Sequence, residues 1–476
     1  MSDGPTRPLR LVQVTRLTQG GGAERIASSL HHGLLGRGHR SWMATATKTG
    51  DDPTVLTIPL PVPGGVTRVL GSVARRGAPK VGRVIGARRT KNLVRGADSP
   101  GWYLDHLRGR EHFGYPATSA IPDLPPEPPD LIHCHNLHGG FFDLRQLAPM
   151  SRRVPLAMTL HDEWTFTGHC GYGIDCERWR TGCGSCPDLT LYPAIRRDGT
   201  RANLRAKQEI YAHSRLYVTT PSQWLMDRAR TSVLAGGAAG WRMIPNGVDR
   251  SIYRPADQMA ARARLDLPPD PFVLLFAAKG ARRSPYKDYR TVSEAAVRAA
   301  AQVPGRPVLC VALGDTGPSE RFENGELRFV PYRSDLDEVA AYFQAADVYL
   351  HAAKAENLPT TILEALSTGL PVVATAIGGI PEEVRSLAGV PGGWSGTAHG
   401  RDAATGVLIA PGDAEAMGSA TAAILRDGDL RATLSANAVK DAAQRFDLEG
   451  QLDTTIDWYR EVIADWHDRN RREGAH

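Results

Sequence analysis

The stretch that decides the fold is Leu9–Leu34, LRLVQVTRLTQGGGAERIASSLHHGL. It opens with a short apolar run, Leu9–Thr15, and passes through three consecutive glycines, Gly20–Gly22. Apolar residues then recur at helical spacing, at Ile26, Leu30 and Leu34. A strand, a glycine-rich turn and a helix in this order form the opening unit of a doubly wound α/β domain.

The same rhythm continues along the chain and restarts after a turn-rich stretch, Pro245–Asp249, which we interpret as the domain linker. Parallel strands require helical crossovers between them, and the spacing of the apolar runs allows these. Further strands are expected at Asp130–Cys134, Val154–Leu160, Leu216–Thr219, Phe272–Ala277, Val308–Leu313, Leu327–Val330, Val348–Ala352, Pro371–Ala374 and Val407–Ile409. Leu448–Asn470 has the apolar spacing of one amphipathic helix.

A chain of 476 residues is too long for one core of ordinary size. The sequence therefore predicts two Rossmann-like domains, 1–245 and 246–445, followed by a C-terminal helix, 446–476, packed back on the first domain. The first domain carries a basic insertion, 61–115, and a cysteine-rich loop, 163–200. Because doubly wound sheets bind ligands outside the carboxyl ends of their strands, we expect the site in a cleft that both sheets face.

The positive charge of the chain is concentrated in one segment. The net charge of the chain is +6. The segment from Val66 to Arg110 contains eleven lysines and arginines and two aspartates, a local charge of +9, so the rest of the chain has a net charge of −3. Basic residues near anionic lipid contribute about 1 kcal/mol each to binding. Peripheral association with the inner face of the membrane is one interpretation of this patch, and a solvated face is the other. The first residues lack a signal-peptide core, so we expect a cytoplasmic protein.

The segment richest in chemistry is Lys354–Ala374, KAENLPTTILEALSTGLPVVA. A strand ends just before it, and Pro359 suits the first turn of a helix. Glu364 then lies inside that helix, whereas Glu356 precedes it. Two carboxylates at different depths can accept hydrogen bonds from hydroxyls at both ends of a sugar nucleotide, on its ribose and on its sugar.

This segment resembles the glutamate-seven-glutamate signature of retaining GT-B glycosyltransferases, the large group 1 / family 4. Gly21–Glu24, Pro245–Asp249 and Gly378–Glu382 resemble further motifs of the family, in the family's order. The resemblance covers essentially the whole chain. It implies a GT-B fold and transfer of a hexosyl or other sugar from a UDP- or GDP-linked donor to a glycan, lipid-linked or small-molecule acceptor. It implies no cofactor for catalysis.

The resemblance also assigns roles to residues. It implies His161, Glu356 and Lys287 as catalytic residues: Glu356 contacts the donor sugar, Lys287 the diphosphate, and His161 orients the sugar, with no protein nucleophile. Glu364 contacts the ribose, and either Arg282 or Arg283 the diphosphate; Asp288 stands where the family has glycine. The implied donor-binding residues are Gly21, Gly22, Arg282, Arg283, Lys287, Tyr332, Glu356, Asn357, Leu358, Pro359, Thr360 and Glu364.

Three histidines, His133, His135 and His138, cluster after a predicted strand. Alternating residues of a strand point to opposite faces. We expect His135 or His138 to line the acceptor side, with metal binding as the alternative.

Four cysteines, Cys170, Cys176, Cys183 and Cys186, lie within one loop-rich stretch and contain a single Cys-x-x-Cys pair. Four thiolates on a compact loop can hold a structural zinc ion. Free thiols or a disulfide are the alternative. The segment His161–Cys170 resembles one carried by a subgroup of the family, which suggests that the cluster belongs to that subgroup.

Two other classes of function compete with the glycosyltransferase. A sugar-nucleotide epimerase or hydrolase on the same paired domains shares the fold and the donor site. Nucleic-acid binding is favoured by the basic patch and the cysteines. It is opposed by the absence of finger or ribbon spacing and of aromatic residues interleaved with the basic ones. We therefore expect no nucleic-acid partner.

Overall fold

The computed structural model describes residues 7–18, 20–60, 94–394, 396 and 398–474. The chain divides into two compact units. Unit 1 comprises Met1–Thr220, Met226–Arg242 and Ile456–His476, and unit 2 comprises Pro221–Leu225 and Met243–Thr455. Most of the basic patch, including Arg83, Arg88 and Arg89, lies outside the described residues.

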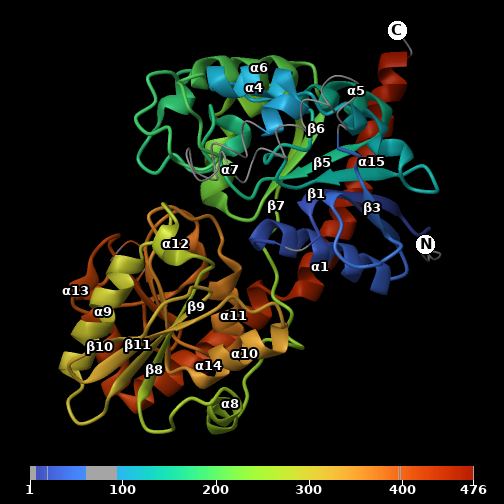
Figure 1. The fold of residues 1–476 in the computed structure, drawn as a ribbon. Helices are drawn as coiled ribbons and strands as arrows, with labels where there is room; N and C mark the ends of the chain where they lie inside the picture. The colour runs from blue at the N-terminus through green and yellow to red at the C-terminus, as the bar shows by residue number, and fades with distance from the viewer. Residues whose placement is uncertain (1–6, 19, 61–93, 395, 397, 475–476) are drawn as a thin grey trace. The chain divides into compact units, whose positions relative to one another are not determined.

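Unit 1 is built on a seven-stranded sheet in the order β3-β2-β1-β4-β5-β6-β7 (Figure 1). The pairs from β3 to β6 are parallel. The strands are β1 (Arg10–Leu17), β2 (Arg40–Thr47), β3 (Val55–Thr57), β4 (Leu131–Cys134), β5 (Leu156–Thr159), β6 (Leu216–Thr220) and β7 (Ala238–Met243). The helices are α1 (Gly22–Gly36), α4 (Pro100–Arg108), α5 (Leu147–Arg153), α6 (Thr200–Ala212) and α7 (Gln223–Arg230). The predicted opening of strand, glycine turn and helix is therefore β1 followed by α1.

Unit 2 has a nine-stranded sheet in the order β10-β11-β9-β8-β12-β13-β16-β14-β15, parallel except for the β10–β11 pair. Its strands are β8 (Phe272–Ala277), β9 (Val308–Leu313), β10 (Glu320–Phe322), β11 (Gly325–Val330), β12 (Val348–His351), β13 (Val372–Thr375), β14 (Ser386–Leu387), β15 (Ala398–His399) and β16 (Gly406–Ile409). Its helices are α8 (Gln258–Arg264), α9 (Tyr289–Gln302), α10 (Leu336–Ala345), α11 (Thr360–Thr368), α12 (Ile380–Glu383), α13 (Ala414–Arg426) and α14 (Gly428–Arg445).

Alternation along the strands of unit 2 builds two separate cores. In β8, Val273 and Leu275 pack into the cluster that also holds Ile362 of α11. Their neighbours Leu274 and Phe276 pack into the second cluster, with helices α9 and α13. Because successive side chains of a strand point to opposite faces, continuous apolar strands need a helical layer on each face. Figure 1 shows these two layers on either side of the sheet.

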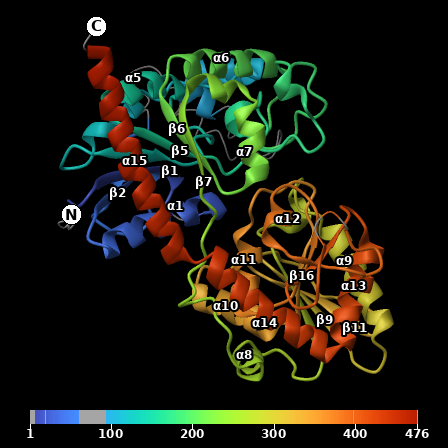
Figure 2. The ribbon, with the colours of Figure 1, turned by 180° about the vertical axis from the view of Figure 1, so that it is seen from behind.

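The last helix, α15 (Leu448–Gly474), contributes residues to both units. From Ile456 onward it packs against unit 1, where Tyr459 and Trp466 are buried and the Trp466 indole donates to the Ser151 carbonyl at 2.8 Å. Figure 2 shows this red helix running along the sheet of unit 1. Among the described residues, no helix has the length and apolarity that a membrane span requires.

Candidate functional site

The site in unit 2 is organised by a backbone seam between two loops. Residues 286–288 follow β8 and the 3₁₀ turn Ala281–Arg283, and they pair with residues 352–354 at the end of β12. The Lys354 amide donates to the Tyr286 carbonyl at 2.8 Å, and the Asp288 amide to the Ala352 carbonyl at 3.0 Å. This seam brings Lys287 beside Glu356, where the ammonium group and the carboxylate form a direct ion pair.

A third group, His351, completes this cluster and was missed in the sequence. It is the last residue of β12 and is fully buried, with Nε2 3.7 Å from Glu356 Oε2 and Nδ1 3.2 Å from the Tyr349 hydroxyl. Burial and the nearby Lys287 charge lower the pKa of His351 to about 4. The available signal was a polar residue at the end of an apolar strand, five positions before Glu356.

Glu356 is held as a carboxylate. Burial alone raises its pKa, but the charge of Lys287 and the contact with His351 outweigh burial and lower the pKa to about 2. An ionised carboxylate only accepts hydrogen bonds. At neutral pH Glu356 is therefore an acceptor for hydroxyl donors, and Lys287 is the cation that it holds in place.

The remaining residues of the signature are fixed by hydrogen bonds and burial. Asn357 Oδ1 accepts from the Ser222 hydroxyl at 2.6 Å, and the Leu358 carbonyl accepts from Asn246 Nδ2 at 3.1 Å. Pro359 caps α11 instead of lying in its first turn, and Thr360 begins the helix. Glu364 is 3% exposed on α11, and the Glu356 side chain is 15% exposed.

Of the two expected arginines, Arg282 and Arg283, both are exposed, and Arg282 has contacts with its own surroundings. Its backbone amide donates to Asp315 at 3.0 Å, and its guanidinium lies 4.3 Å from the centre of the Phe329 ring. Tyr332, expected among the donor-binding residues, is 44% exposed and has Lys279 Nζ 4.5 Å from its ring centre.

In unit 1 the expected site residues form a buried polar chain. His135 Nδ1 lies 3.0 Å from His161 Nε2, and His135 Nε2 lies 3.0 Å from Gln13 Oε1. Gln13 Nε2 in turn donates to the hydroxyl of Tyr459 at 3.3 Å, and that hydroxyl lies 2.5 Å from His133 Nδ1. Burial lowers the pKa of His161 to about 4 and that of His133 to about 3, and lowers the pKa of His135 well below its ordinary value. These imidazoles are neutral at pH 7.

The other expected residues of unit 1 have local partners. His138 Nε2 lies 3.1 Å from Asp162 Oδ2. Gly22 begins α1, and the Gly21 amide donates to Glu24 at 2.9 Å. A Cβ added at Gly22 meets no atom within 4 Å, so the turn itself does not require glycine there.

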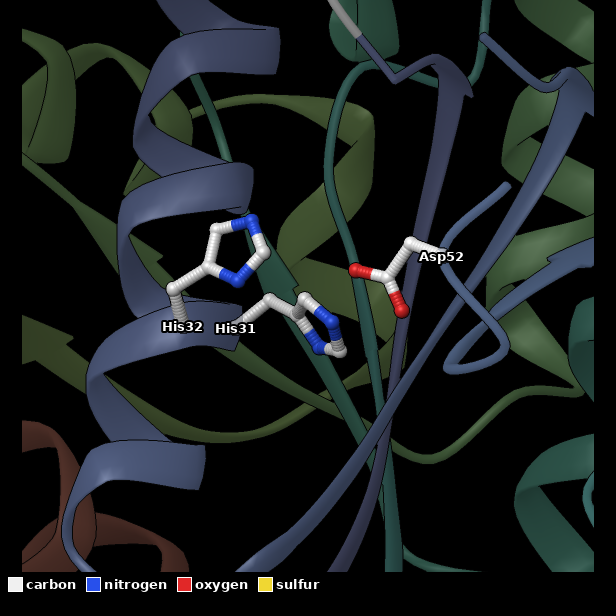
Figure 3. A group of neighbouring side chains, drawn as sticks. All are labelled: His31, His32 and Asp52. Atoms are coloured by element: carbon white, nitrogen blue, oxygen red, sulfur yellow. The ribbon is translucent and has the colours of Figure 1, made fainter. Parts of the chain in front are cut away.

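One trio in the described part of the chain, His31, His32 and Asp52, brings three ligand atoms within 4.8 Å of one another. Figure 3 shows the two histidines on α1 and Asp52 opposite them. Both ring nitrogens of His31 already have hydroxyl partners, Ser41 at 2.8 Å and Thr54 at 2.9 Å. We therefore interpret this trio as a polar contact between α1 and the sheet.

The geometry of two doubly wound units, with a cation and carboxylates at the carboxyl ends of the strands of unit 2, is that of the GT-B class. Two family models agree: Glycosyltransferase Family 4 matches residues 20–252, and Glycosyl transferases group 1 matches residues 257–441. Together they cover most of the sequence. The chain belongs to this glycosyltransferase family.

Curated relatives match part of the chain. One named for colanic acid biosynthesis, WcaC of Escherichia coli K12, is 27% identical over 52% of this chain and 60% of its own length. The D-inositol 3-phosphate glycosyltransferase of Mycobacterium tuberculosis F11 is 30% identical over 58% of this chain and 55% of its own length. The matches thus span little more than half the length of these relatives.

Solved structures share the fold at low identity. Sucrose-phosphate synthase of Thermosynechococcus elongatus has a TM-score of 0.56 and 19% identity, covering 96% of this chain and 100% of that one. HepE of Anabaena, solved in complex with UDP and glucose, has a TM-score of 0.54 and 17% identity, covering 94% and 98%. These likenesses establish the GT-B fold.

Gly378 is required by the backbone of the site. Its φ is +59°, and a Cβ there would lie 1.8 Å from the Glu356 carbonyl oxygen. Gly412 has a similar φ of +80° with no atom within 4 Å of an added Cβ. We expect Gly412→Ala to cost only backbone strain, about 1–2 kcal/mol. Gly378→Ala adds a backbone clash and should cost about 3–5 kcal/mol in urea unfolding. An equal loss of unfolding free energy in the two variants would contradict a backbone clash at Gly378.

Glu383 is a buried carboxyl whose two oxygens have no hydrogen-bond partner among the described residues. Burial and the Glu356 charge raise its pKa well above 4.5. The folded state therefore keeps a proton that the unfolded chain releases above about pH 4.5, and stability falls as pH rises past that value.

We expect Glu383→Gln to remove this part of the pH dependence. The unfolding free energy of the variant relative to the parent should rise with pH above about pH 4.5, by at most about 1.4 kcal/mol per pH unit while folded Glu383 stays protonated. Urea unfolding across this range measures it, with the exposed Glu323→Gln as control. If the difference in unfolding free energy between variant and parent stayed constant across this pH range, Glu383 would be ionised in the folded protein.

Proposed function

We propose that this protein is a retaining glycosyltransferase that transfers a sugar from a UDP- or GDP-linked donor to a hydroxyl of a sugar, lipid-linked or small-molecule acceptor. The observation that carries the proposal is the ion pair between Lys287 and Glu356 at the carboxyl edge of the unit 2 sheet. Family membership supports the reaction class. The complex of HepE with UDP and glucose supports the kind of donor.

The ion pair suits a site that receives a diphosphate. Lys287 lies on a seam-anchored loop and is only partly exposed, so its charge is positioned before any ligand arrives. Glu356 accepts from sugar hydroxyls, while Lys287 and the exposed Arg283 take up the charge that develops on the leaving phosphate. Fixed cations at the position of developing charge lower the barrier without reorganisation.

His161 acts in this proposal as a neutral hydrogen-bonding group. With a pKa near 4, it adds no positive charge beside an anomeric carbon that itself becomes positive. The chain of His135, Gln13 and Tyr459 fixes the orientation of its ring. In the reaction the bond from the anomeric carbon to phosphate breaks, and the electron pair leaves with the nucleoside diphosphate. The acceptor oxygen attacks from the same face and passes its proton to the departing phosphate.

The acceptor is a hydroxyl compound by this proposal. One relative is named for an inositol phosphate acceptor and another for colanic acid biosynthesis. An inositol phosphate is a polyhydroxylated compound, which agrees with a hydroxyl acceptor. An epimerase or hydrolase on the same fold is distinguished by its product, because it yields an epimer or a free sugar from the donor instead of a glycoside.

Nucleotide binding is tested by thermal shift with UDP, GDP and ADP. We expect UDP or GDP to raise the melting temperature, since a ligand at 100 times its Kd adds about 2.7 kcal/mol. Lys287→Ala should abolish the shift, whereas the exposed Arg290→Ala, on the neighbouring helix α9, should keep it. If the nucleotide raised the melting temperature of Lys287→Ala as much as that of the parent, the diphosphate would bind at a site without Lys287.

Turnover tests the roles of the pair. Lys287→Ala and Glu356→Gln should each lower donor-dependent turnover about 100-fold or more, the scale for removing a charge-stabilising group. Circular dichroism should show both variants folded, and Arg290→Ala again serves as the control. Near-normal turnover in both variants would overturn the proposed site.

A further inference from the structure

The cysteine-rich loop of unit 1 has almost no regular secondary structure. Between β5 and α6, residues 163–199 contain only two 3₁₀ turns, Trp164–Phe166 and Arg178–Arg180. Loops of this length without their own elements are uncommon in compact domains. The fold of this loop therefore needs a source of stability other than helix or strand pairing.

The first part of the loop is anchored by side chains, whereas its tip is held by backbone amides: that of Cys183 donates to the Arg178 carbonyl at 2.8 Å, and that of Gly184 to the Thr200 hydroxyl at 2.9 Å. Lys207 of α6 donates to the carbonyls of Trp164 at 2.6 Å and Thr167 at 3.1 Å, and the Phe166 and Trp179 rings pack at 5.1 Å. The tip, 182–185, consists of consecutive residues with positive φ, including Cys183 at +53° and Ser185 at +50°. Non-glycine residues held in this region need support from their surroundings.

All four cysteines of the loop surround one cavity at this tip. The cavity has a volume of about 20 Å³ and is lined by Cys170, Cys176, Cys183 and Cys186, together with His169. The four are free thiols. No three of their sulfurs come within 4.8 Å of one another among the described residues, so they ring the cavity more widely than the ligands of a closed metal site.

The sulfurs nevertheless act on one another electrostatically. Burial raises the pKa of Cys170 to about 12, and Cys183 and Cys186 contribute to that rise. Burial likewise raises the pKa of Cys183 and of Cys186, and Cys176 adds to each. All four thiols line one small cavity, and a divalent cation bound there would convert them to thiolates.

His169 has partners of its own. Its Nδ1 donates to the Pro193 carbonyl at 3.0 Å, and the Asp188 carbonyl also contacts the ring. Its Nε2 lies 3.4 Å from Cys186 Sγ. This places the imidazole beside the sulfur cluster as a neighbour that orients Cys186, which leaves four sulfurs for a tetrahedral ion.

We propose that Cys170, Cys176, Cys183 and Cys186 bind one structural zinc ion, which draws the sulfurs together and closes the tip of the loop. Four thiols release four protons as four Zn–S bonds form, and the site carries a net charge of −2. Two cations lie near that charge: Lys207, whose charge acts on Cys183 and which is also paired with Glu111 at 2.9 Å, and Arg178, which lines the cavity. Zinc prefers four tetrahedral ligands and binds thiolate at about 2.3 Å.

Metal content tests the proposal directly. We expect protein purified without chelator or added metal to contain about one zinc ion per chain, as measured by inductively coupled plasma mass spectrometry. Cobalt substituted for zinc should give the intense sulfur-to-metal absorption of a tetrahedral thiolate site. Removing the metal should lower the melting temperature, and added zinc should restore it.

Variants identify the ligands. Cys176→Ser and Cys186→Ser should each lose the metal, and Cys310→Ser, at a buried strand cysteine of unit 2, should keep it. His169→Ala should also keep it. If a Cys→Ser variant is insoluble, the cobalt spectrum of the unmutated protein still decides between four sulfurs and a mixed set.

Three results would overturn the proposal. These are metal-free protein with four titratable thiols, loss of two thiols to a disulfide under non-reducing conditions, and a cobalt spectrum of three sulfurs and one nitrogen. None depends on catalytic activity, so the outcome is independent of the proposed glycosyltransferase function.

Discussion

The backbone seam between residues 286–288 and 352–354 is the constraint on which the site of unit 2 depends. Lys287 and Glu356 lie 69 positions apart in the chain and on loops after different strands. The parallel sheet aligns the ends of β8 and β12, and two backbone hydrogen bonds then fix the loops against each other. Without the seam, Lys287 would not be held beside Glu356, and the low pKa of Glu356 would lose its largest favourable cause.

The seam also explains why the neighbouring residues are so restricted. Gly378 must lie against the Glu356 carbonyl, and Glu382 accepts from the amides of Gln223 and Trp224 at 2.7 Å each. The side chain of His351 is fully buried. A site held from all sides in this way can keep opposite charges close together while their partners are absent, which is the preorganisation that electrostatic catalysis needs.

The sequence predicted the positions of the strands better than the side-chain contacts of the site. Each strand expected from an apolar run is present within two residues of its predicted ends, because buried parallel strands are continuously apolar. Strand β2 was missed because RSWMATAT is rich in small and polar residues, although five of its eight positions are buried. The signature indicated Glu356 and Glu364. The surroundings of His351 and Glu383 and the Gln13–Tyr459 contact depend on residues distant in sequence. Of these, only His351 had a local signal, as a polar residue at the end of an apolar strand.

The buried histidines show where polar groups decide the chemistry of unit 1. His133, His135 and His161 are neutral because burial outweighs any stabilisation of their charge. A neutral imidazole donates at one nitrogen and accepts at the other, so every ring in a chain of contacts fixes the tautomer of the next. Tyr459 contacts both His133 and Gln13 of this chain, and Gln13 leads through His135 to His161. The C-terminal helix therefore contributes, through Gln13 and His135, to the orientation of His161, a histidine nearly 300 residues before it.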